Sequence, residues 1–254
     1  SMSPMAILRA VKKCDMLISG GGSLLQDVTS SKSLHYYLSI IRCAEFFHKK
    51  VFIYSQGIGP IDRPGNRRAA AAALKRADGI VVRDERSASL LEEIGIARDK
   101  VVITADPVIR MKKPDGDVGA EILRKAGVSL DGRLTVGWAI RERDTDSRFV
   151  KELLRSIQMM KDKYNAQSVL IPFHYEEDGE VCRHIAAQLP DDTAVCLNEK
   201  YLSEDMLSII GNMDLLVGVR LHSLIYAAIM GVPLIGISYD PKCTAFLNSV
   251  GLDK

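Results

Sequence analysis

The chain has 254 residues and a formal net charge of +2, with 47% hydrophobic and 26% charged residues. This balance is typical of a globular domain protein and gives no sign of a nucleic-acid tail or a strongly acidic partner. No apolar run reaches the roughly 18 residues of a membrane span, and no secretory signal opens the chain. Five cysteines without CxxC spacing favour a reduced, cytoplasmic protein with no metal site.

The first half alternates short apolar strands with helical patterns, which predicts a parallel α/β sheet covered on both faces. The predicted strands are 16–19, 51–55, 79–82 and 101–104, and the predicted helices are 33–48, 66–76 and 85–94.

A glycine cluster follows the first strand, where Gly21 and Gly22 precede Ser23. Glycine amides can approach an anion closely, and the serine can add a hydroxyl, so these residues are candidates for substrate binding. GxGxxG spacing and a GK[ST] ending are both missing, which disfavours dinucleotide and P-loop sites. A tight strand-to-helix turn explains the same residues equally well.

Two arginines follow the next strands at the same predicted sheet edge. Arg63 ends the loop after the second strand, where a guanidinium can hold a carboxylate or phosphate in bidentate fashion. Arg83 follows the third strand and is a second candidate for substrate binding. Asp84 is predicted to cap the following helix, with Ser87 in its first turn. A solvated loop arginine is the competing interpretation of Arg63.

The segment 106–117 breaks the pattern with two prolines, a glycine and a charge cluster. We therefore predict two Rossmann-like parallel-sheet domains, residues 1–110 and 111–254, and expect the ligand in the cleft between them. The predicted strands of the second half are 134–140, 168–173, 193–196, 214–217 and 234–238. The predicted helices are 118–126, 146–164, 178–189, 204–210, 221–230 and 244–250.

Two loop residues of the second half, Arg141 and His174, are candidates for binding a sugar or its diphosphate. Each follows a predicted strand, so both belong to the carboxyl edge of the sheet. His174 is also explained as a surface histidine, and the acidic residues 176–178 as a helix start favoured by the macrodipole.

Polar side chains gather after the last two strands. Arg220, His222 and Ser223 follow the fourth strand of this half, and Lys242 follows the fifth. An imidazole between two cations predicts a site for an anionic substrate that also needs proton transfer. The start of a helix tends to keep an imidazole neutral, which suits a general base. A histidine held in a domain contact is the competing interpretation.

Six motifs in register suggest a family. They are SGGGSLLQD (19–27), YSQGIGP (54–60), VVRDERS (81–87), ADP (105–107), GVRLHS (218–223) and GVPLIGISYDPK (231–242). Together they resemble the polysaccharide pyruvyl transferases, specifically the CsaB-type enzymes that modify a secondary cell wall polymer involved in S-layer anchoring. The resemblance implies a GT-B-like pair of Rossmann-like domains.

The resemblance also implies a reaction and its catalytic residues. Members transfer an enolpyruvyl unit from phosphoenolpyruvate to a sugar and close a cyclic ketal, with no cofactor. The acceptor is a lipid-diphosphate-linked saccharide at the inner membrane face, which implies at most peripheral membrane contact. Carried over by motif, Arg63, His222 and Lys242 are the catalytic and donor-site residues. The two cations clamp the donor, and His222 exchanges protons.

Members of the family usually begin with a further strand and a G-x-x-N-x-G-D-E segment, and they continue beyond the last helix found here. Since this chain opens almost directly on the helix before Ser19, we expect a fragment truncated at both ends.

Other functions share the predicted fold. A GT-B glycosyltransferase that uses a nucleotide sugar is the main alternative. A non-catalytic binding module derived from a transferase is a third hypothesis, against which the retained Arg63, His222 and Lys242 argue. A nicotinamide dehydrogenase is disfavoured because GxGxxG is missing.

Overall fold

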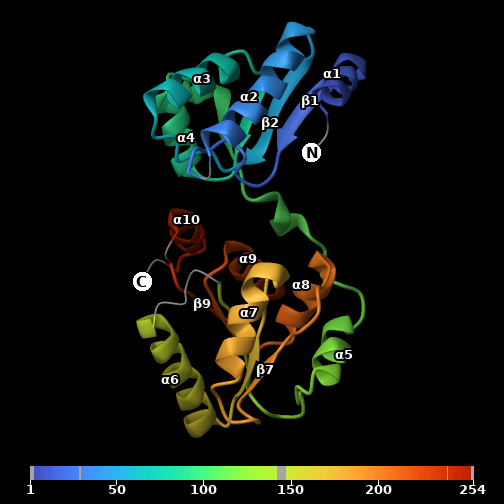
Figure 1. Cartoon of the computed structure of the whole chain (residues 1–254), viewed down its shortest axis with the longest axis vertical. Coiled ribbons are helices and arrows are strands. Elements are labelled where there is room, and N and C mark those ends of the chain that lie inside the picture. The colour runs from blue at the N-terminus through green and yellow to red at the C-terminus, as the bar shows by residue number, and fades with distance from the viewer. Residues whose placement is uncertain (1–2, 29, 142–146, 239, 253–254) are drawn as a thin grey trace. The chain divides into compact units, whose positions relative to one another are not determined.

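The computed structural model describes residues 3–28, 30–141, 147–238 and 240–252. The chain divides into two compact units, Ser1–Pro107 and Val108–Lys254. Figure 1 draws the first from blue to green and the second from green to red. The division falls in the proline-rich and charged stretch that opens at Asp106, where the short 3₁₀ turn η2 (Pro107–Arg110) lies.

The described part of the first unit contains a parallel sheet in the order β1-β2-β3-β4. Its strands are β1 (Met16–Gly20), β2 (Lys50–Gln56), β3 (Gly79–Val82) and β4 (Val101–Ile103). Its helices are α1 (Pro4–Lys13), α2 (Ser31–Phe46), α3 (Pro64–Leu74), α4 (Glu85–Glu93) and the 3₁₀ turn η1 (Arg98–Lys100).

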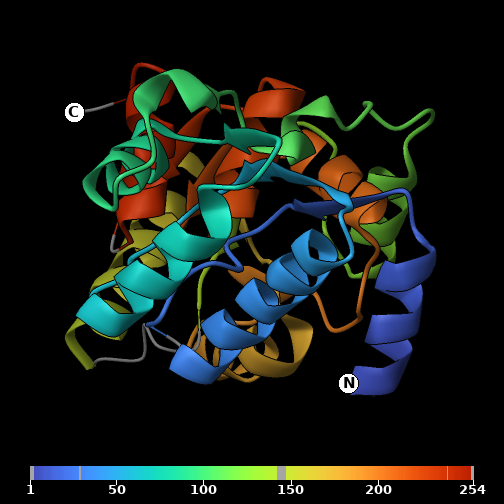
Figure 2. The same cartoon turned by 90° about the horizontal axis from the view of Figure 1, so that it is seen from above.

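Among the described residues, the helices of the first unit cover one face of this sheet and leave the other exposed, which corrects the expectation of helices on both faces. Strands that follow one another in order, joined by right-handed crossovers, place their connecting helices on the same side. Figure 2 shows α2 and α3 running side by side on one side of the strands. On the other face, Ile18 is 60% exposed, Tyr54 is 53% exposed and Val102 is 56% exposed.

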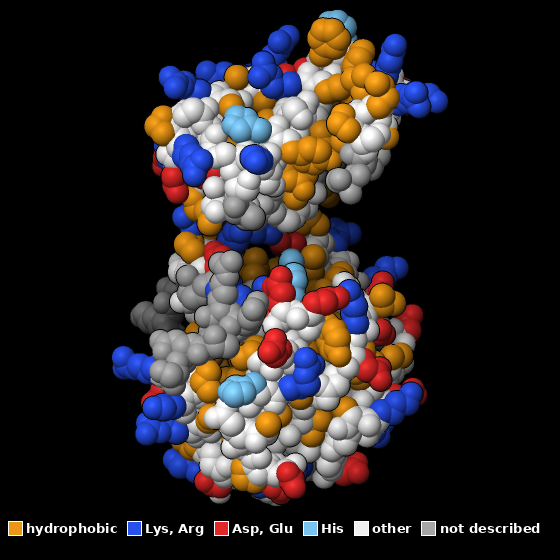
Figure 3. Space-filling view, in the orientation of Figure 1, with side chains coloured by type: hydrophobic (Ala, Val, Ile, Leu, Met, Phe, Trp, Pro, Cys, Tyr) orange, Lys and Arg blue, Asp and Glu red, His pale blue; other side chains and the backbone are white. Residues whose placement is uncertain are grey.

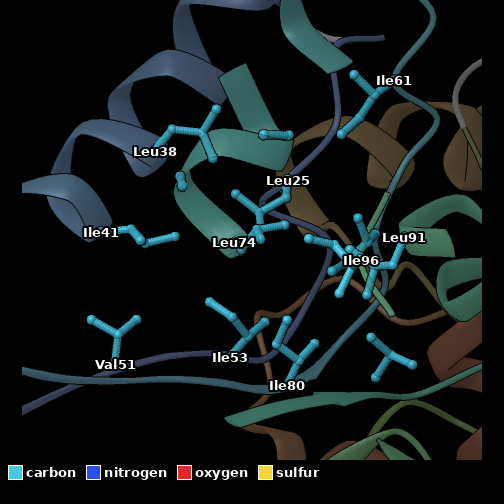
Figure 4. Close-up of a cluster of buried hydrophobic side chains, with 14 of the residues drawn as sticks. Leu25, Leu38, Ile41, Val51, Ile53, Ile61, Leu74, Ile80, Leu91 and Ile96 are labelled. Carbon is cyan, nitrogen blue, oxygen red and sulfur yellow. The ribbon is translucent and has the colours of Figure 1, made fainter. Parts of the chain in front are cut away.

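The covered face holds the core of the first unit. Alternate residues of β2 point toward the helices, so Val51 and Ile53 are buried while Phe52 is not. Figure 4 shows Ile53 and the neighbouring strand residue Ile80 below Leu38 of α2 and Leu74 of α3. Burying a side chain of this size contributes about 1.5–3 kcal/mol, so this face stabilises the unit.

The second unit contains a parallel sheet in the order β7-β6-β5-β8-β9. Its strands are β5 (Thr135–Ala139), β6 (Gln167–Leu170), β7 (Ala194–Cys196), β8 (Leu215–Gly218) and β9 (Leu234–Gly236). Its helices are α5 (Val118–Lys125), α6 (Ser147–Tyr164), α7 (Tyr175–Ala186), α8 (Ser203–Gly211), α9 (Leu221–Met230) and α10 (Pro241–Ser249).

The strand order reverses between β5 and β8. Right-handed crossovers then place α6 and α7 on one face of the sheet and α8 and α9 on the other. The central strand β5 is buried along its whole length, and Trp138 within it donates from Nε1 to Ser168 Oγ at 2.9 Å. Such a reversal is where doubly wound sheets bind ligands, outside the carboxyl ends of the strands.

The predicted α/β class with two parallel sheets is confirmed. Every predicted strand coincides with an observed one, with ends shifted by up to three residues. Among the described helices, none combines the length and the apolar composition that a membrane crossing requires.

Candidate functional site

Arg83 joins two loops at the carboxyl edge of the first sheet by hydrogen bonds. Its guanidinium donates from Nη1 to Asp106 Oδ2 at 2.6 Å and from Nη2 to Ser23 Oγ at 3.0 Å. The side chain of Arg83 is 6% exposed, and that of Asp106 is 10% exposed. Gly57 lies against this group, since a Cβ there would come within 2.8 Å of Arg83 Nη2 and Ser23 Oγ. Two predicted substrate-binding residues, Arg83 and Ser23, are thus brought together and paired within the unit.

The glycine turn after β1 offers fewer donors than the sequence predicts. Gly21 and Gly22 adopt φ values of +74° and +60°, which favour glycine. The Gly21 amide donates to Tyr54 O at 3.1 Å, and Gly57 N donates to Gly22 O at 2.9 Å. The Gly21 amide already donates to a carbonyl of β2, so it is not available to an anion. The predicted anion-binding residues are therefore reduced to Gly22 and Ser23.

Arg63 occupies the N-cap position of α3, and its side chain is exposed. Its Nη1 donates to Ser31 Oγ at 3.0 Å. Asp27 holds its backbone, because Asp27 Oδ2 accepts from Arg63 N at 3.2 Å and Oδ1 accepts from Asp62 N at 3.1 Å. Asn66 Nδ2 also donates to Asp27 Oδ2, at 2.8 Å. Burial raises the pKa of Asp27, but these hydrogen bonds outweigh it and hold the pKa below its ordinary value.

A buried ion pair lies at the carboxyl edge of the second sheet. Arg220 Nε donates to Asp178 Oδ2 at 3.1 Å, and Nη2 donates to Asp178 Oδ1 at 2.5 Å. Asp178 is fully buried, and the Arg220 side chain is 17% exposed. Asp178 Oδ2 also accepts from His174 N at 2.9 Å, and Glu177 lies 3.5 Å from Arg220 Nη2. This pair joins the start of α7 to the start of α9 and fixes the guanidinium.

His222 and Ser223 lie in the first turn of α9, directly after Arg220. The His222 side chain is exposed, as an acid or base requires. Ser223 is fully buried, and its Oγ donates to Arg220 O at 2.6 Å. A hydroxyl with no exposed surface does not reach a ligand, so we assign Ser223 to the turn rather than to substrate contact.

The loops after β5, β8 and β9 meet around the buried thiol of Cys243. Its Sγ donates to Val219 O at 3.4 Å. Burial and then the charge of Asp240 raise the pKa of Cys243 to about 11, while Arg141 and Lys242 act to lower it. Both cations therefore act electrostatically on this thiol. Lys242 lies in the first turn of α10, where its backbone N donates to Asp240 Oδ1 at 2.9 Å.

His174 is the N-cap residue of α7, and its side chain is exposed. The helix begins at Tyr175, three residues before the predicted start. Figure 3 shows acidic and basic side chains mixed over α7, where Lys200 Nζ donates to Glu176 Oε1 at 2.8 Å. The structure thus separates the acidic trio into two surface residues, Glu176 and Glu177, and the buried Asp178.

Sequence reasoning missed Asp27 and Asp178, the carboxylates that hold Arg63 and Arg220. A signal for Asp178 was available, since it shares a helical face with the buried Val181 and Ile185. No group of three or more His, Cys, Asp or Glu suited to a metal ion occurs within the described residues.

Solved structures with the same fold cover nearly the whole chain. UDP-GlcNAc 2-epimerase from Methanocaldococcus jannaschii superposes with a TM-score of 0.70 at 14% identity, covering 99% of this chain and 71% of that one. The Anabaena protein Alr3699/HepE in complex with UDP-glucose gives a TM-score of 0.57 at 12% identity, covering 91% of this chain and 62% of that one. At these identities the similarity is one of fold, here GT-B-like.

Sequence comparison finds a relative and a family. The amylovoran biosynthesis protein AmsJ from Erwinia amylovora is 22% identical over 258 residues, which cover 95% of this chain and 61% of that protein. The chain thus spans about three fifths of the length of this relative. The profile of the family described as polysaccharide pyruvyl transferase matches residues 1–241.

Proposed function

This chain belongs to the polysaccharide pyruvyl transferase family, and we propose that it acts in the transfer of a pyruvyl group from phosphoenolpyruvate to a saccharide. The supporting observation is the cationic edge of the second sheet. Arg141 and Lys242 both act electrostatically on the Cys243 thiol, and Arg220 is held by Asp178. Phosphoenolpyruvate carries a phosphate and a carboxylate, which such cations can bind and orient.

Each catalytic residue has a role in this proposal. Lys242 binds an anionic group of the donor, and Arg220 and Arg141 add positive charge at the same edge as Lys242, while Arg63 keeps the donor-binding role that the family motif implies. His222 is the proton carrier, because an imidazole exchanges protons near neutral pH while the arginines and the lysine stay charged. Its place in the first turn of α9, exposed and two residues after Arg220, supports this role.

The proposed reaction balances without a cofactor. One acceptor hydroxyl adds to C2 of the donor, C3 gains a proton, and the C2–O bond to phosphate breaks. The second hydroxyl then adds to C2 and closes the cyclic ketal. Of the two hydroxyl protons, one ends on C3 and the other leaves with phosphate. His222 serves as base toward the hydroxyl and as acid toward C3 or the phosphate.

The acceptor belongs to the same proposal. We take it to be a lipid-diphosphate-linked saccharide of a cell wall polymer, as in CsaB-type enzymes, met at the inner face of the membrane. The amides of Gly22 and Ser23, in a turn that leaves open space around Gly22, are the proposed contacts for its diphosphate. His174, exposed at the start of α7, is a further candidate for contact with the sugar.

The proposal is tested by following phosphate release from phosphoenolpyruvate in the presence of a lipid-diphosphate saccharide. We expect His222→Ala to abolish release, since the proton carrier is lost. His184→Ala is the matched control, because His184 is exposed in the last turn of α7 and should keep full activity. Retained activity in His222→Ala would remove the residue from the mechanism. Turnover of a nucleotide sugar instead of phosphoenolpyruvate would support a glycosyltransferase.

A further inference from the structure

Two cysteines meet between α7 and the edge strand β7. Cys182 lies in the middle of α7 and is fully buried, while Cys196 ends β7 and is partly exposed. Cys182 and Cys196 pack in one hydrophobic cluster, and the two thiols are near enough to shift each other's pKa. Both sulfurs are in the reduced state.

The fold places these side chains on the same side of the sheet. Cys182 belongs to the hydrophobic cluster beneath α6 and α7, and Ala194 and Cys196 pack against that cluster. Val195, between them, packs in the cluster of the opposite face, as the alternation of a strand requires. Strand alternation puts Cys196 on the face of the sheet that α7 covers, and Cys182 lies on the buried face of α7, so both thiols lie between the helix and the sheet.

The two thiols differ in reactivity. The neighbouring Cys182 thiol lowers the pKa of Cys196, and the Arg183 guanidinium lowers it further against the effect of burial. The Cys196 thiol, followed by burial, raises the pKa of Cys182. Cys196 is also the more accessible sulfur, because β7 lies at the edge of the sheet. Cys196 therefore has the properties of an attacking thiolate and Cys182 those of a resolving thiol.

We propose that Cys182 and Cys196 form a thiol–disulfide site that small disulfides, of the glutathione disulfide class, oxidise to an intramolecular bond. The Cys196 thiolate attacks one sulfur of the small disulfide and releases one thiolate. The Cys182 sulfur then attacks Cys196, passes its proton to the released thiolate, and displaces the second small thiolate, which takes up from solvent the proton that Cys196 lost. Overall, two protein thiols and one disulfide give one protein disulfide and two small thiols.

The two cysteines lie near the cationic edge of the second sheet, because Cys182 is on the same helix as Asp178. Cys182 lies one helical turn after Asp178 on α7, and Asp178 holds Arg220. A bond from Cys182 to Cys196 would tie this part of α7 directly to the sheet. The other buried thiol of the unit, Cys243, interacts instead with Val219 O and with charged groups, so the same exchange is not expected there.

The test is oxidation of the whole chain with glutathione disulfide, followed by alkylation and mass mapping. The number of alkylatable thiols should fall from five to three, with peptides containing 182 and 196 joined. Cys182→Ser should stop at a glutathione adduct on Cys196, and Cys196→Ser should leave Cys182 unmodified. The matched control Cys43→Ser, a partly exposed thiol of the first unit, should still form the bond.

The proposal would be overturned by either of two results in the wild-type chain, which need no variant to fold. One is full alkylation of Cys182 and Cys196 after oxidation. The other is glutathione adducts at Cys14 and Cys43 without a link between 182 and 196.

Discussion

Arg220→Met removes the guanidinium that faces the fully buried carboxylate of Asp178. Methionine keeps much of the apolar stem of the arginine, so the change acts mainly on charge and hydrogen bonding. Removing one partner of a buried ion pair typically costs about 3–5 kcal/mol, since the other charge stays in the interior. Asp178 keeps its bond from His174 N at 2.9 Å, which favours the lower end, about 3 kcal/mol.

The expected effect is readily measured. A loss of about 3 kcal/mol, with a slope of about 2 kcal/mol per molar urea, lowers the unfolding midpoint by about 1.5 M. Trp138 is the single tryptophan of the chain and is buried in β5, so its fluorescence follows the second unit alone. This selectivity matters because two units need not unfold together.

A surface ion pair between α7 and the loop after β7 serves as the control. Lys200 and Glu176 are 72% and 69% exposed, so Lys200→Met should leave the unfolding midpoint nearly unchanged. Asp178→Asn is a second variant that keeps the shape of the side chain and should destabilise less than Arg220→Met. A loss below about 1 kcal/mol for Arg220→Met would refute the reasoning about this pair.

The remaining predictions concern the first unit and use melting followed by circular dichroism. The pKa of Asp27 is lowered in the folded state, so its hydrogen bonds stabilise the unit above the unfolded pKa of about 4 and are lost as the pH falls through the folded pKa. The stability advantage of the wild type over Asp27→Asn should therefore shrink from pH 7 to pH 3. Gly57→Ala should destabilise by about 1–3 kcal/mol through crowding, whereas Gly65→Ala, with open space around it, should be near neutral. Ile18→Thr on the open face should cost less than about 0.5 kcal/mol, and Ile53→Thr in the core about 2–4 kcal/mol.

Each of these has a result that contradicts it. An advantage of wild type over Asp27→Asn that is unchanged at low pH would mean that the carboxylate bonds contribute little. Equal melting temperatures for the two alanine variants would remove the close approach at Gly57. Equal losses for the two threonine variants would mean that the outer face of the first sheet is covered in solution.

The fold class can be predicted from local patterns, because each short strand carries its own apolar signal. The exposed face of the first sheet cannot be predicted in this way. In β1 the consecutive residues Met16, Leu17 and Ile18 are all apolar, yet Ile18 is 60% exposed. Periodicity describes one strand at a time, while coverage depends on strand order, which the sequence pattern leaves undetermined.

The candidate residues were found because parallel strands end at one edge of a sheet, as for Arg141 and Arg220 after the neighbouring strands β5 and β8. Their partners were harder to find. Asp178 stands beside two surface carboxylates of the same charge, and its helical spacing to the buried Val181 and Ile185 is the sequence signal that distinguishes it. Asp84 was easier, since a cap acts within three residues, and its predicted bond to Ser87 N is present at 2.8 Å.

Calorimetric titration of this chain with phosphoenolpyruvate tests the central claim most directly, with inorganic phosphate and UDP-sugars as controls. We predict selective binding of phosphoenolpyruvate that is lost in Lys242→Ala and in Arg63→Ala, because these cations hold the donor. Lys200→Met, a surface change in the loop between β7 and α8, should leave binding intact. Preference for a UDP-sugar, or binding of phosphoenolpyruvate that survives both alanine substitutions, would contradict the proposed donor site.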